Sequence, residues 1–322
     1  MRAVVVSRHG GPEVLELQDV PDPEASAGEL LVRVEAAGVN FMDVYGRIGR
    51  PPYARETPFV PGAEGSGTVL SVGPEVSGFS PGDRVTWLDA PGSYAERAVV
   101  KARRSVRIPD GVSFRNAAAV MLQGITAHYL IVSTYQVRPG DDVAIHAAAG
   151  GVGRLLVQFA KHFGARVVAT TSTPEKAAVA RAAGADFVVE YDEFQDEVAR
   201  LTSGLGVAVV YDGVGAATFE MSLQAITRRG YLVLFGAASG PVPPFDLARL
   251  GQNSLYVTRP MLGAYVADDR ELAWRAREVF SALEEGWLSI EIGGTYPLRE
   301  AARAHSDLEG RRTTGKLLLT TD

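Results

Sequence analysis

Six short apolar segments between residues 125 and 262 constrain the fold more than any other feature of this 322-residue sequence. Helical patterns separate them, for example at residues 151–163 and 174–183. Short apolar strands that alternate with helices are typical of a parallel sheet covered on both faces. Six such strands with helical crossovers predict a doubly wound α/β sheet. The segments are DDVAIHA, ARVVATT, DFVVEY, VAVVYDG, YLVLFGA and SLYVTR.

The regions before and after these segments show a different pattern. The first ~120 residues are rich in glycine and proline, and breakers such as GGP, PDP and SPGD separate short β-type runs, which predicts a β-rich domain with tight turns. After residue 265 a helical pattern leads to a final GKLLLTT, which is expected to return to the first domain and pair with one of its strands. We therefore predict a first part at 1–124, an inserted α/β domain at 125–262 and a return at 263–322.

Composition and charge narrow the possible partners. The net charge of −6, from 38 acidic and 32 basic residues, argues against an extended nucleic-acid footprint. The sequence has no cysteine, which excludes disulfides, thiolate metal sites and a cysteine nucleophile. The N-terminal apolar run is too short for a signal peptide, and no stretch is expected to reach the ~20 apolar residues of a membrane span. We expect a cytoplasmic protein without a membrane partner.

The first apolar segment leads into a glycine-rich turn and then a helix, in the order VAIHA, AAGGVG and RLLVQF. Glycines let the backbone approach a pyrophosphate, and the N-terminus of the helix offers free N–H groups. Gly150 and Gly151 are expected to make this approach, and Gly153 to let the helix pack against the strand. Ala148 replaces the first glycine of the usual pattern. Between a strand and a helix, this turn predicts a dinucleotide site.

The loop after the second segment indicates which dinucleotide binds. Where an acid would contact the ribose hydroxyls of NAD, the sequence ATTSTPEK offers hydroxyls and a cation. Ser172, Thr173 and Lys176 are candidates to pair with a 2′-phosphate, which an acid would repel. Glu175, in the first turn of the following helix, is expected to point away. NADPH is therefore favoured over NADH.

Several motifs make the sequence similar to a known family. The glycine-patterned block at residues 61–85 is the most specific, and HGGPEVL, GVNFMDVY, HAAAGGVG, VVYDGVG, SLYVTRP and GKLLL accompany it. Over essentially its whole length the chain resembles the zinc-free, ζ-crystallin-like quinone oxidoreductases of the medium-chain dehydrogenase/reductase superfamily. The resemblance implies a GroES-like β-rich catalytic domain, built from the N-terminal part and the C-terminal tail, with a Rossmann domain inserted between them. It also implies an active site in the cleft, and a homodimer through the edge of the Rossmann sheet, here SLYVTRPML.

The same comparison argues against a metal site. Zinc members of the superfamily place a cysteine where this chain has Asn40 and a histidine where it has Ala63, so only Glu64 remains. The five histidines show no close metal-ligand spacing. Because a lone oxygen ligand cannot hold zinc, we expect a zinc-independent reaction.

A site without metal favours an acceptor that needs little activation. An alcohol dehydrogenase requires a Lewis acid or a positioned base, whereas a quinone is already electrophilic. We therefore expect NADPH-dependent reduction of a quinone, by hydride or single-electron transfer. The alternative is reduction of an activated C=C bond in an alkenal, enone or enoyl thioester. A further alternative is an RNA-binding or structural crystallin-type role, although the basic stretch Lys101–Arg107 lacks interleaved aromatic residues.

The resemblance also implies individual site residues. Asn40 and Asp43 would be polar anchors beside the nicotinamide, and Tyr45 a proton donor or substrate contact. The alternative for Asn40 and Asp43 is a helix cap with a first-turn acid, and for Tyr45 a core tyrosine. Tyr53, in the RPPY loop, and Gln123 would line the substrate pocket.

The other candidate cofactor contacts lie mostly where strands end, since ligands of doubly wound folds bind at the carboxyl ends of strands. Tyr191 is expected at the adenosine ribose phosphate. Lys316 is a further possible cofactor contact, but a solvated basic face is the favoured interpretation of EGRRTTGK. The remaining candidates are Phe41, Thr126, Tyr129, Val152, Gly215, Phe235, Gly236, Ala237, Met261, Leu262 and Arg311.

Overall fold

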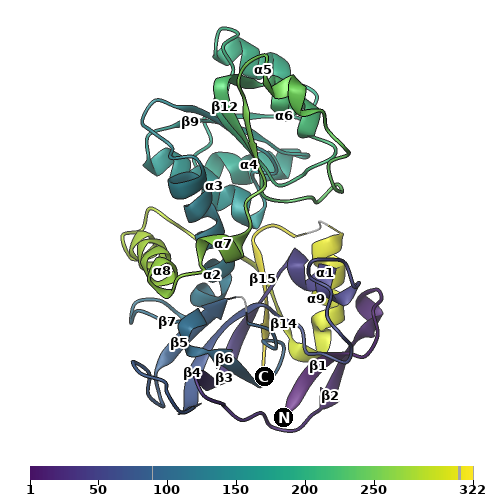
Figure 1. Ribbon diagram of the computed structural model, residues 1–322, viewed down its shortest axis with the longest axis vertical. Coiled ribbons are helices and arrows are strands. Elements are labelled where there is room, and N and C mark those ends of the chain that lie inside the picture. Colours follow the sequence, from purple (N-terminus) through teal and green to yellow (C-terminus); the bar gives the residue numbers. More distant parts are fainter. Residues whose placement is uncertain (89, 311–312, 322) are drawn as a thin grey trace. The chain divides into compact units, whose positions relative to one another are not determined.

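The computed structural model describes residues 1–88, 90–310 and 313–321 and divides the chain into two compact units (Figure 1). Unit 1 comprises Met1–Leu122, Asp268–Glu285 and Ile290–Asp322. Unit 2 comprises Gln123–Ala267 and Gly286–Ser289. The division of the chain into domains at 124 and 262 stays a prediction.

Unit 2 contains a six-stranded parallel sheet that confirms the predicted doubly wound fold. The chain begins in the middle of the sheet, runs outward to one edge, returns to the middle and continues to the other edge. The order is β10 (Phe187–Val189), β9 (Arg166–Thr170), β8 (Asp142–Ile145), β11 (Val207–Asp212), β12 (Ile226–Leu234) and β13 (Tyr256–Thr258). The strand order therefore reverses between β8 and β11, where such folds bind ligands.

Helices connect these strands. The first, α3, follows the glycine turn and buries Leu155, Leu156 and Phe159, because its apolar residues recur at helical spacing. The next, α4, begins with Thr173 as N-cap and Pro174 in its first turn, a favourable start for a helix. The helices of unit 2 after α2 are α3 (Gly151–His162), α4 (Pro174–Ala182), α5 (Phe194–Leu201), α6 (Phe219–Gln224), η4 (Leu247–Leu250) and α7 (Leu262–Tyr265).

One long helical segment is predominantly apolar. It consists of α2 (Phe114–Tyr129) and η3 (Leu130–Thr134), and the limit between the units falls within α2. By length and composition its 21 residues pass as a membrane span, so the expectation that no stretch would do so is wrong. Its most apolar window is 72% buried inside the protein, as in the core helix of a globular fold.

Unit 1 is β-rich, and both ends of the chain lie among its strands (Figure 1). Its large sheet has the order β14 (Ile292–Pro297), β15 (Lys316–Thr320), β3 (Glu29–Val39), β4 (Glu64–Val72), β5 (Arg84–Leu88) and β7 (Ser105–Arg107), and β6 (Arg97–Lys101) also pairs with β3. The strands β1 (Arg2–Val6) and β2 (Leu15–Asp19) form a separate pair. Antiparallel pairing of β15 with β3, with Leu317 opposite Val39, confirms the predicted return of the C-terminal segment.

The core of unit 1 unites distant parts of the sequence. Trp87, Leu30 and Val32 are fully buried in it together with Ala304 from a C-terminal helix. The helices of unit 1 other than α2 are η1 (Pro12–Val14), α1 (Phe41–Arg47), η2 (Ala102–Arg104), α8 (Asp269–Glu284), η5 (Leu298–Glu300) and α9 (Ala301–Glu309). Helices α1 and α9 lie against each other, and Arg47 at the end of α1 contacts His305 and Glu309 of α9.

Candidate active site

The glycine turn after β8 is closely packed. Gly150 N–H donates to the carbonyl of Ala147 at 2.9 Å, and Ala147 itself has a positive φ of 51°. A side chain at Gly153 would overlap the carbonyl of Ala147, which explains why α3 needs glycine there to pack against the turn. Gly150 is the N-cap of α3, so the N–H groups of the first helical turn, from Gly151 onward, have no acceptor within the helix.

The side chain of Gln123 lies directly against this turn. A Cβ on Gly151 would overlap the amide of Gln123, so glycine is required for this approach. Within the described chain, the buried Oε1 of Gln123 has no hydrogen-bond partner. An unsatisfied buried acceptor beside helix N–H groups fits a site completed by a polar ligand, such as a dinucleotide.

The loop after β9 carries the candidate 2′-phosphate contacts. Lys176 Nζ lies 3.4 Å from Ser172 Oγ, and Thr173 Oγ1 accepts the N–H of Lys176 at 3.3 Å. The Thr173 hydroxyl lowers the pKa of the Glu175 carboxyl, and the expectation that Glu175 points away from the phosphate stays a prediction. A carboxylate therefore accompanies the cation in this loop.

Tyr191 follows β10 and contacts the glycine turn. Its hydroxyl accepts the N–H of Ala147 at 3.2 Å. Its ring stacks on that of His146, with centroids 5.7 Å apart and an angle of 26° between the planes. Sequence reasoning missed His146, although its place directly after the first strand of the sheet could have marked it.

The turns after β11 and β12 lie together at the carboxyl ends of neighbouring strands. A side chain at Gly236 would overlap the backbone of Gly213, and one on Gly215 would lie 2.7 Å from the carbonyl of Gly240. The candidates Gly215, Phe235, Gly236 and Ala237 therefore occupy one compact group in unit 2.

The other cofactor candidates of unit 2 differ in burial and in their place in the fold. Thr126 and Tyr129 are buried in α2, and the ring of Tyr129 stacks on Tyr265 at 4.3 Å between centroids. Met261 is 41% exposed and precedes Leu262, the first residue of α7. Val152 lies in the first turn of α3. Arg311 lies outside the described residues.

A buried polar cluster occupies the centre of unit 1. The ammonium of Lys316 pairs with the carboxylate of Glu64 and donates to Asn40 Oδ1 at 2.6 Å. Asn40 Nδ2 donates to Glu64 Oε1 at 2.8 Å, and the N–H of Leu122 donates to Glu64 Oε2 at 2.7 Å. A side chain on Gly38 would overlap the Glu64 carboxyl.

This cluster changes the interpretation of the C-terminal basic stretch. Lys316 was expected on a solvated face, but both Lys316 and Glu64 have fully buried side chains, so that expectation is wrong. Glu64 is the one residue that remains at the zinc-ligand positions of the superfamily, and its carboxylate is paired with the Lys316 ammonium. Within the described ranges, no group of three or more His, Cys, Asp or Glu side chains could hold a metal ion.

Asp43 lies in the first turn of α1 and accepts hydrogen bonds from two sides. The N–H of Asn40 donates to its Oδ2 at 2.9 Å, so Asn40 and Asp43 do cap α1, and the Tyr94 hydroxyl donates at 3.2 Å. Tyr94 is bonded in turn to His305 Nε2 at 3.1 Å, and Arg47 Nη1 lies 3.1 Å from His305 Nδ1. Because a guanidinium only donates, Nδ1 accepts and Nε2 carries the proton.

Burial determines the charge states of Asp43 and His305 within this hydrogen-bonded group. Loss of solvation raises the pKa of Asp43 from 3.8 to about 7, against the opposing hydrogen bond from Asn40 and the charge of Lys316. Burial, and then the positive charge of Arg47, lower the pKa of His305 to about 3. His305 is therefore neutral at physiological pH, and among these hydrogen-bonded residues it is Asp43 that titrates near neutrality.

An aromatic group lies at α1 and the loop that follows it. The rings of Phe41 and Tyr45 are 6.3 Å apart, and those of Tyr45 and Tyr53 are 5.6 Å apart. The guanidinium of Arg50 lies over the Tyr45 ring at 4.9 Å. All three aromatic side chains are partly exposed, so Tyr45 is not a fully buried core tyrosine.

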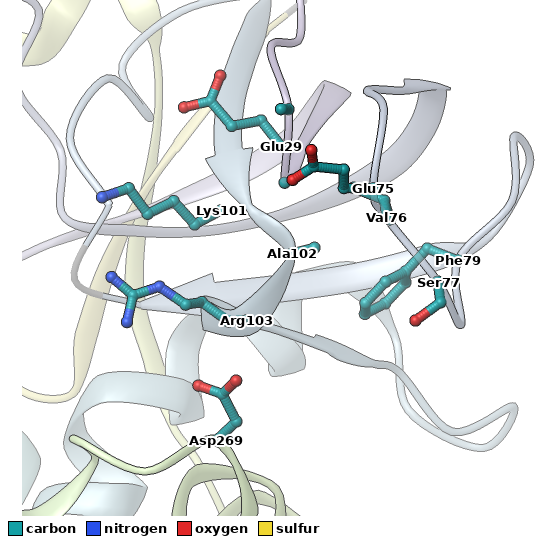
Figure 2. Close-up of a pocket in the computed structure, with 11 residues that line it drawn as sticks. Glu29, Glu75, Val76, Ser77, Phe79, Lys101, Ala102, Arg103 and Asp269 are labelled. Carbon is teal, nitrogen blue, oxygen red and sulfur yellow. The ribbon is translucent and has the colours of Figure 1, made fainter.

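A separate cavity of about 530 Å³ in unit 1 lies among residues that were not predicted to form the site (Figure 2). Lys101 and Arg103, from the basic stretch, line it together with Glu29, Glu75 and Asp269. Carboxylates interspersed with the cations weaken the attraction for a polyanion, so this cavity does not favour the RNA-binding alternative.

Comparison with known proteins defines the class and then the family. Residues 26–110 match the alcohol dehydrogenase GroES-like domain, and residues 151–277 match the zinc-binding dehydrogenase family. With the folds of the two units, these matches define a medium-chain dehydrogenase/reductase. The chain is 45% identical over 322 residues to a quinone oxidoreductase of Pseudomonas aeruginosa, with 99% of each chain covered. It therefore belongs to the quinone oxidoreductase family of that superfamily.

Two further relatives bear on cofactor and substrate. The solved structure of Escherichia coli quinone oxidoreductase complexed with NADPH superimposes with a TM-score of 0.96, at 38% identity and over 100% of both chains. A 2-haloacrylate reductase of a Burkholderia species is 38% identical over 326 residues, with 98% of each chain covered.

Proposed function

We propose that this protein is an NADPH-dependent quinone oxidoreductase. The observation that carries the proposal is the full-length similarity to quinone oxidoreductases, one of which has been solved with NADPH. The 2-haloacrylate reductase is a more distant relative, at 38% rather than 45% identity, so reduction of an activated C=C bond is the less favoured activity.

The cofactor is proposed to bind unit 2. The first-turn N–H groups of α3 would bind the pyrophosphate, because a helix N-terminus attracts anions. Lys176 and Ser172, which already lie 3.4 Å apart, would bind the 2′-phosphate. Tyr191 would contact the adenosine half, and the group around Gly215 and Phe235 the nicotinamide half. Bound NADPH supplies a hydride from its nicotinamide ring.

The quinone is proposed to bind unit 1 at the aromatic group of Phe41, Tyr45 and Tyr53. A flat quinone ring stacks favourably on aromatic side chains, and the cation of Arg50 favours the negative charge that develops on a quinone oxygen during reduction. Reduction to the hydroquinone takes one hydride and one proton, and Tyr45 is the proposed donor of that proton. Asn40 contributes by holding the start of α1, since Glu64 and Lys316 bind its side chain.

The proposal includes a homodimer and a cytoplasmic location. The edge strand β13 supports the dimer, because Tyr256 is 51% exposed there and stacks on Tyr231 of β12, so an apolar ring faces outward at the edge. The cytoplasmic location rests on the sequence expectation alone. Light scattering of the purified protein tests the dimer, which a monomeric mass would contradict.

A steady-state screen tests the activity. Wild-type protein is supplied with NADPH or NADH and with 1,4-benzoquinone, 9,10-phenanthrenequinone, crotonyl thioester, an alkenal or 2-chloroacrylate. The proposal predicts the highest kcat/KM for NADPH with a quinone. A higher kcat/KM for a C=C acceptor than for every quinone would contradict the proposed quinone reduction and favour reduction of an activated C=C bond. Tyr45→Phe, which keeps the ring, is expected to lower kcat for quinones more than it changes the KM for NADPH.

A further inference from the structure

A buried histidine in unit 2 has no part in the contacts proposed above. His146 directly follows β8 and is fully buried. Its Nδ1 lies 2.8 Å from Thr170 Oγ1, at the end of β9, and its Nε2 lies 2.9 Å from Ser222 Oγ, in α6. Burial lowers the pKa of His146 to about 4, against the opposing charge of Asp212, so the ring is neutral at physiological pH.

The direction of these hydrogen bonds follows from the partners of Ser222. Its hydroxyl lies 3.0 Å from the carboxylate of Asp212 and 2.7 Å from the carbonyl of Thr218, and both of these groups only accept. The Ser222 hydroxyl donates to both of these groups, so its oxygen is left to accept the Nε2–H of His146. The His146 Nδ1 then accepts the hydroxyl proton of Thr170.

Asp212 also accepts hydrogen bonds from the turn after β11. Its Oδ1 accepts the N–H of Val214 at 2.8 Å and that of Gly215 at 3.0 Å. Its Oδ2 accepts the Thr218 hydroxyl at 2.7 Å as well as that of Ser222. The Nε2 of His146 is therefore connected, through one hydroxyl and one carboxylate, to the turn at Gly215 proposed for the nicotinamide half.

The face of the same ring supports the other half of the cofactor site. It stacks on Tyr191, whose hydroxyl accepts the N–H of Ala147 in the glycine turn. The ring of Phe194 packs against it at 4.7 Å between centroids, with 62° between the planes, which holds the imidazole from another side.

We propose that His146 is a positioning residue that joins the two halves of the NADPH site. The ring face holds Tyr191 for the adenosine half, and Nε2 holds the turn at Gly215 for the nicotinamide half through Ser222 and Asp212. This inference rests on the proposed function, because it takes NADPH as the ligand. His146 is fully buried and acts through these residues without touching the cofactor.

The test compares the two halves of the cofactor separately. Dissociation constants of the full-length protein are measured for NADPH, for 2′,5′-ADP and for reduced nicotinamide mononucleotide. Ser222→Ala is expected to weaken binding of the mononucleotide about fivefold to tenfold, the effect of one buried hydrogen bond, and to change that of 2′,5′-ADP less than about twofold. Tyr191→Phe, the matched control, is expected to weaken the binding of 2′,5′-ADP and to leave the binding of the mononucleotide unchanged.

The histidine variants then separate the ring from its nitrogens. His146→Phe keeps a ring against Tyr191 and is expected to behave like Ser222→Ala. His146→Asn lacks the ring and Nε2 and is expected to weaken both fragments. If a histidine variant does not fold, the dissociation constants of Ser222→Ala for the two fragments test the inference by themselves. Wild-type affinity of Ser222→Ala for the mononucleotide, or equal weakening of both fragments, would overturn the inference. Wild-type protein that fails to bind NADPH would overturn the proposed function instead.

Discussion

Replacing Lys316 with methionine tests the buried ion pair of unit 1. Methionine fills much of the same space, but it leaves the Glu64 carboxylate fully buried with only Asn40 and Leu122 among its described donors. Removal of one partner of a buried ion pair costs ~3–5 kcal/mol, because the remaining charge is neither solvated nor compensated. At ~1.4 kcal/mol per factor of ten, the folding equilibrium changes by roughly two to four orders of magnitude.

Urea denaturation followed by tryptophan fluorescence measures this loss, since Trp87 is fully buried in the core of unit 1. The double variant Lys316→Met, Glu64→Gln is the matched control, because it removes both charges. Its amide oxygen can still accept the N–H of Leu122, and its amide N–H groups can donate to Asn40 Oδ1, which Lys316 no longer binds. It is expected to recover most of the lost free energy of unfolding. A loss below ~1 kcal/mol in Lys316→Met, or a double variant as unstable as the single one, would refute the reasoning.

Three further predictions concern cofactor choice, pH and metal. Lys176→Ala should raise the KM for NADPH roughly tenfold or more and leave that for NADH nearly unchanged, and equal effects on both would contradict the 2′-phosphate assignment. Because Asp43 with a pKa of about 7 holds a proton that the unfolded chain releases, the free energy of unfolding should fall as pH rises from about 4 to about 7; Asp43→Asn should flatten this dependence in urea titrations. Exhaustive chelation should leave turnover unchanged because Lys316 holds Glu64, whereas activity lost with EDTA and restored by zinc would refute this.

The fold could be predicted largely because its signals are local. Each strand of unit 2 is a short apolar run bounded by polar residues, and its short length, together with the helical periodicity of segments such as α3, separates the strands from the helices. The return of the tail was predictable for a similar reason, since GKLLLTT is a short apolar run of strand type. Its pairing partners, β14 and β3, came from the structure.

The polar clusters were not predictable from patterns, because their members are far apart in the sequence. Lys316 stands beside arginines and threonines, as a solvated lysine would, yet its partner Glu64 is 252 residues away. His305 lies in a charged helix, and only the packing of α9 against α1 places it between Arg47 and Tyr94. The residues near a charged side chain in the sequence do not indicate a distant partner, so sequence analysis assigns the charged side chain to the surface by default.

The cofactor loop could be read from the sequence because its candidate residues lie close together along the chain. Ser172, Thr173 and Lys176 were recognised from their types, and the structure places Lys176 Nζ 3.4 Å from Ser172 Oγ.

The oxidation of NADPH and of NADH by 1,4-benzoquinone, followed at 340 nm with purified wild-type protein, tests the central claim most directly. We predict that NADPH is consumed in proportion to the hydroquinone formed, with a kcat/KM at least about tenfold above that for NADH, as expected when one charge-assisted contact to the 2′-phosphate is lost. No oxidation of NADPH with the quinone, or an equal kcat/KM for NADH, would contradict the account.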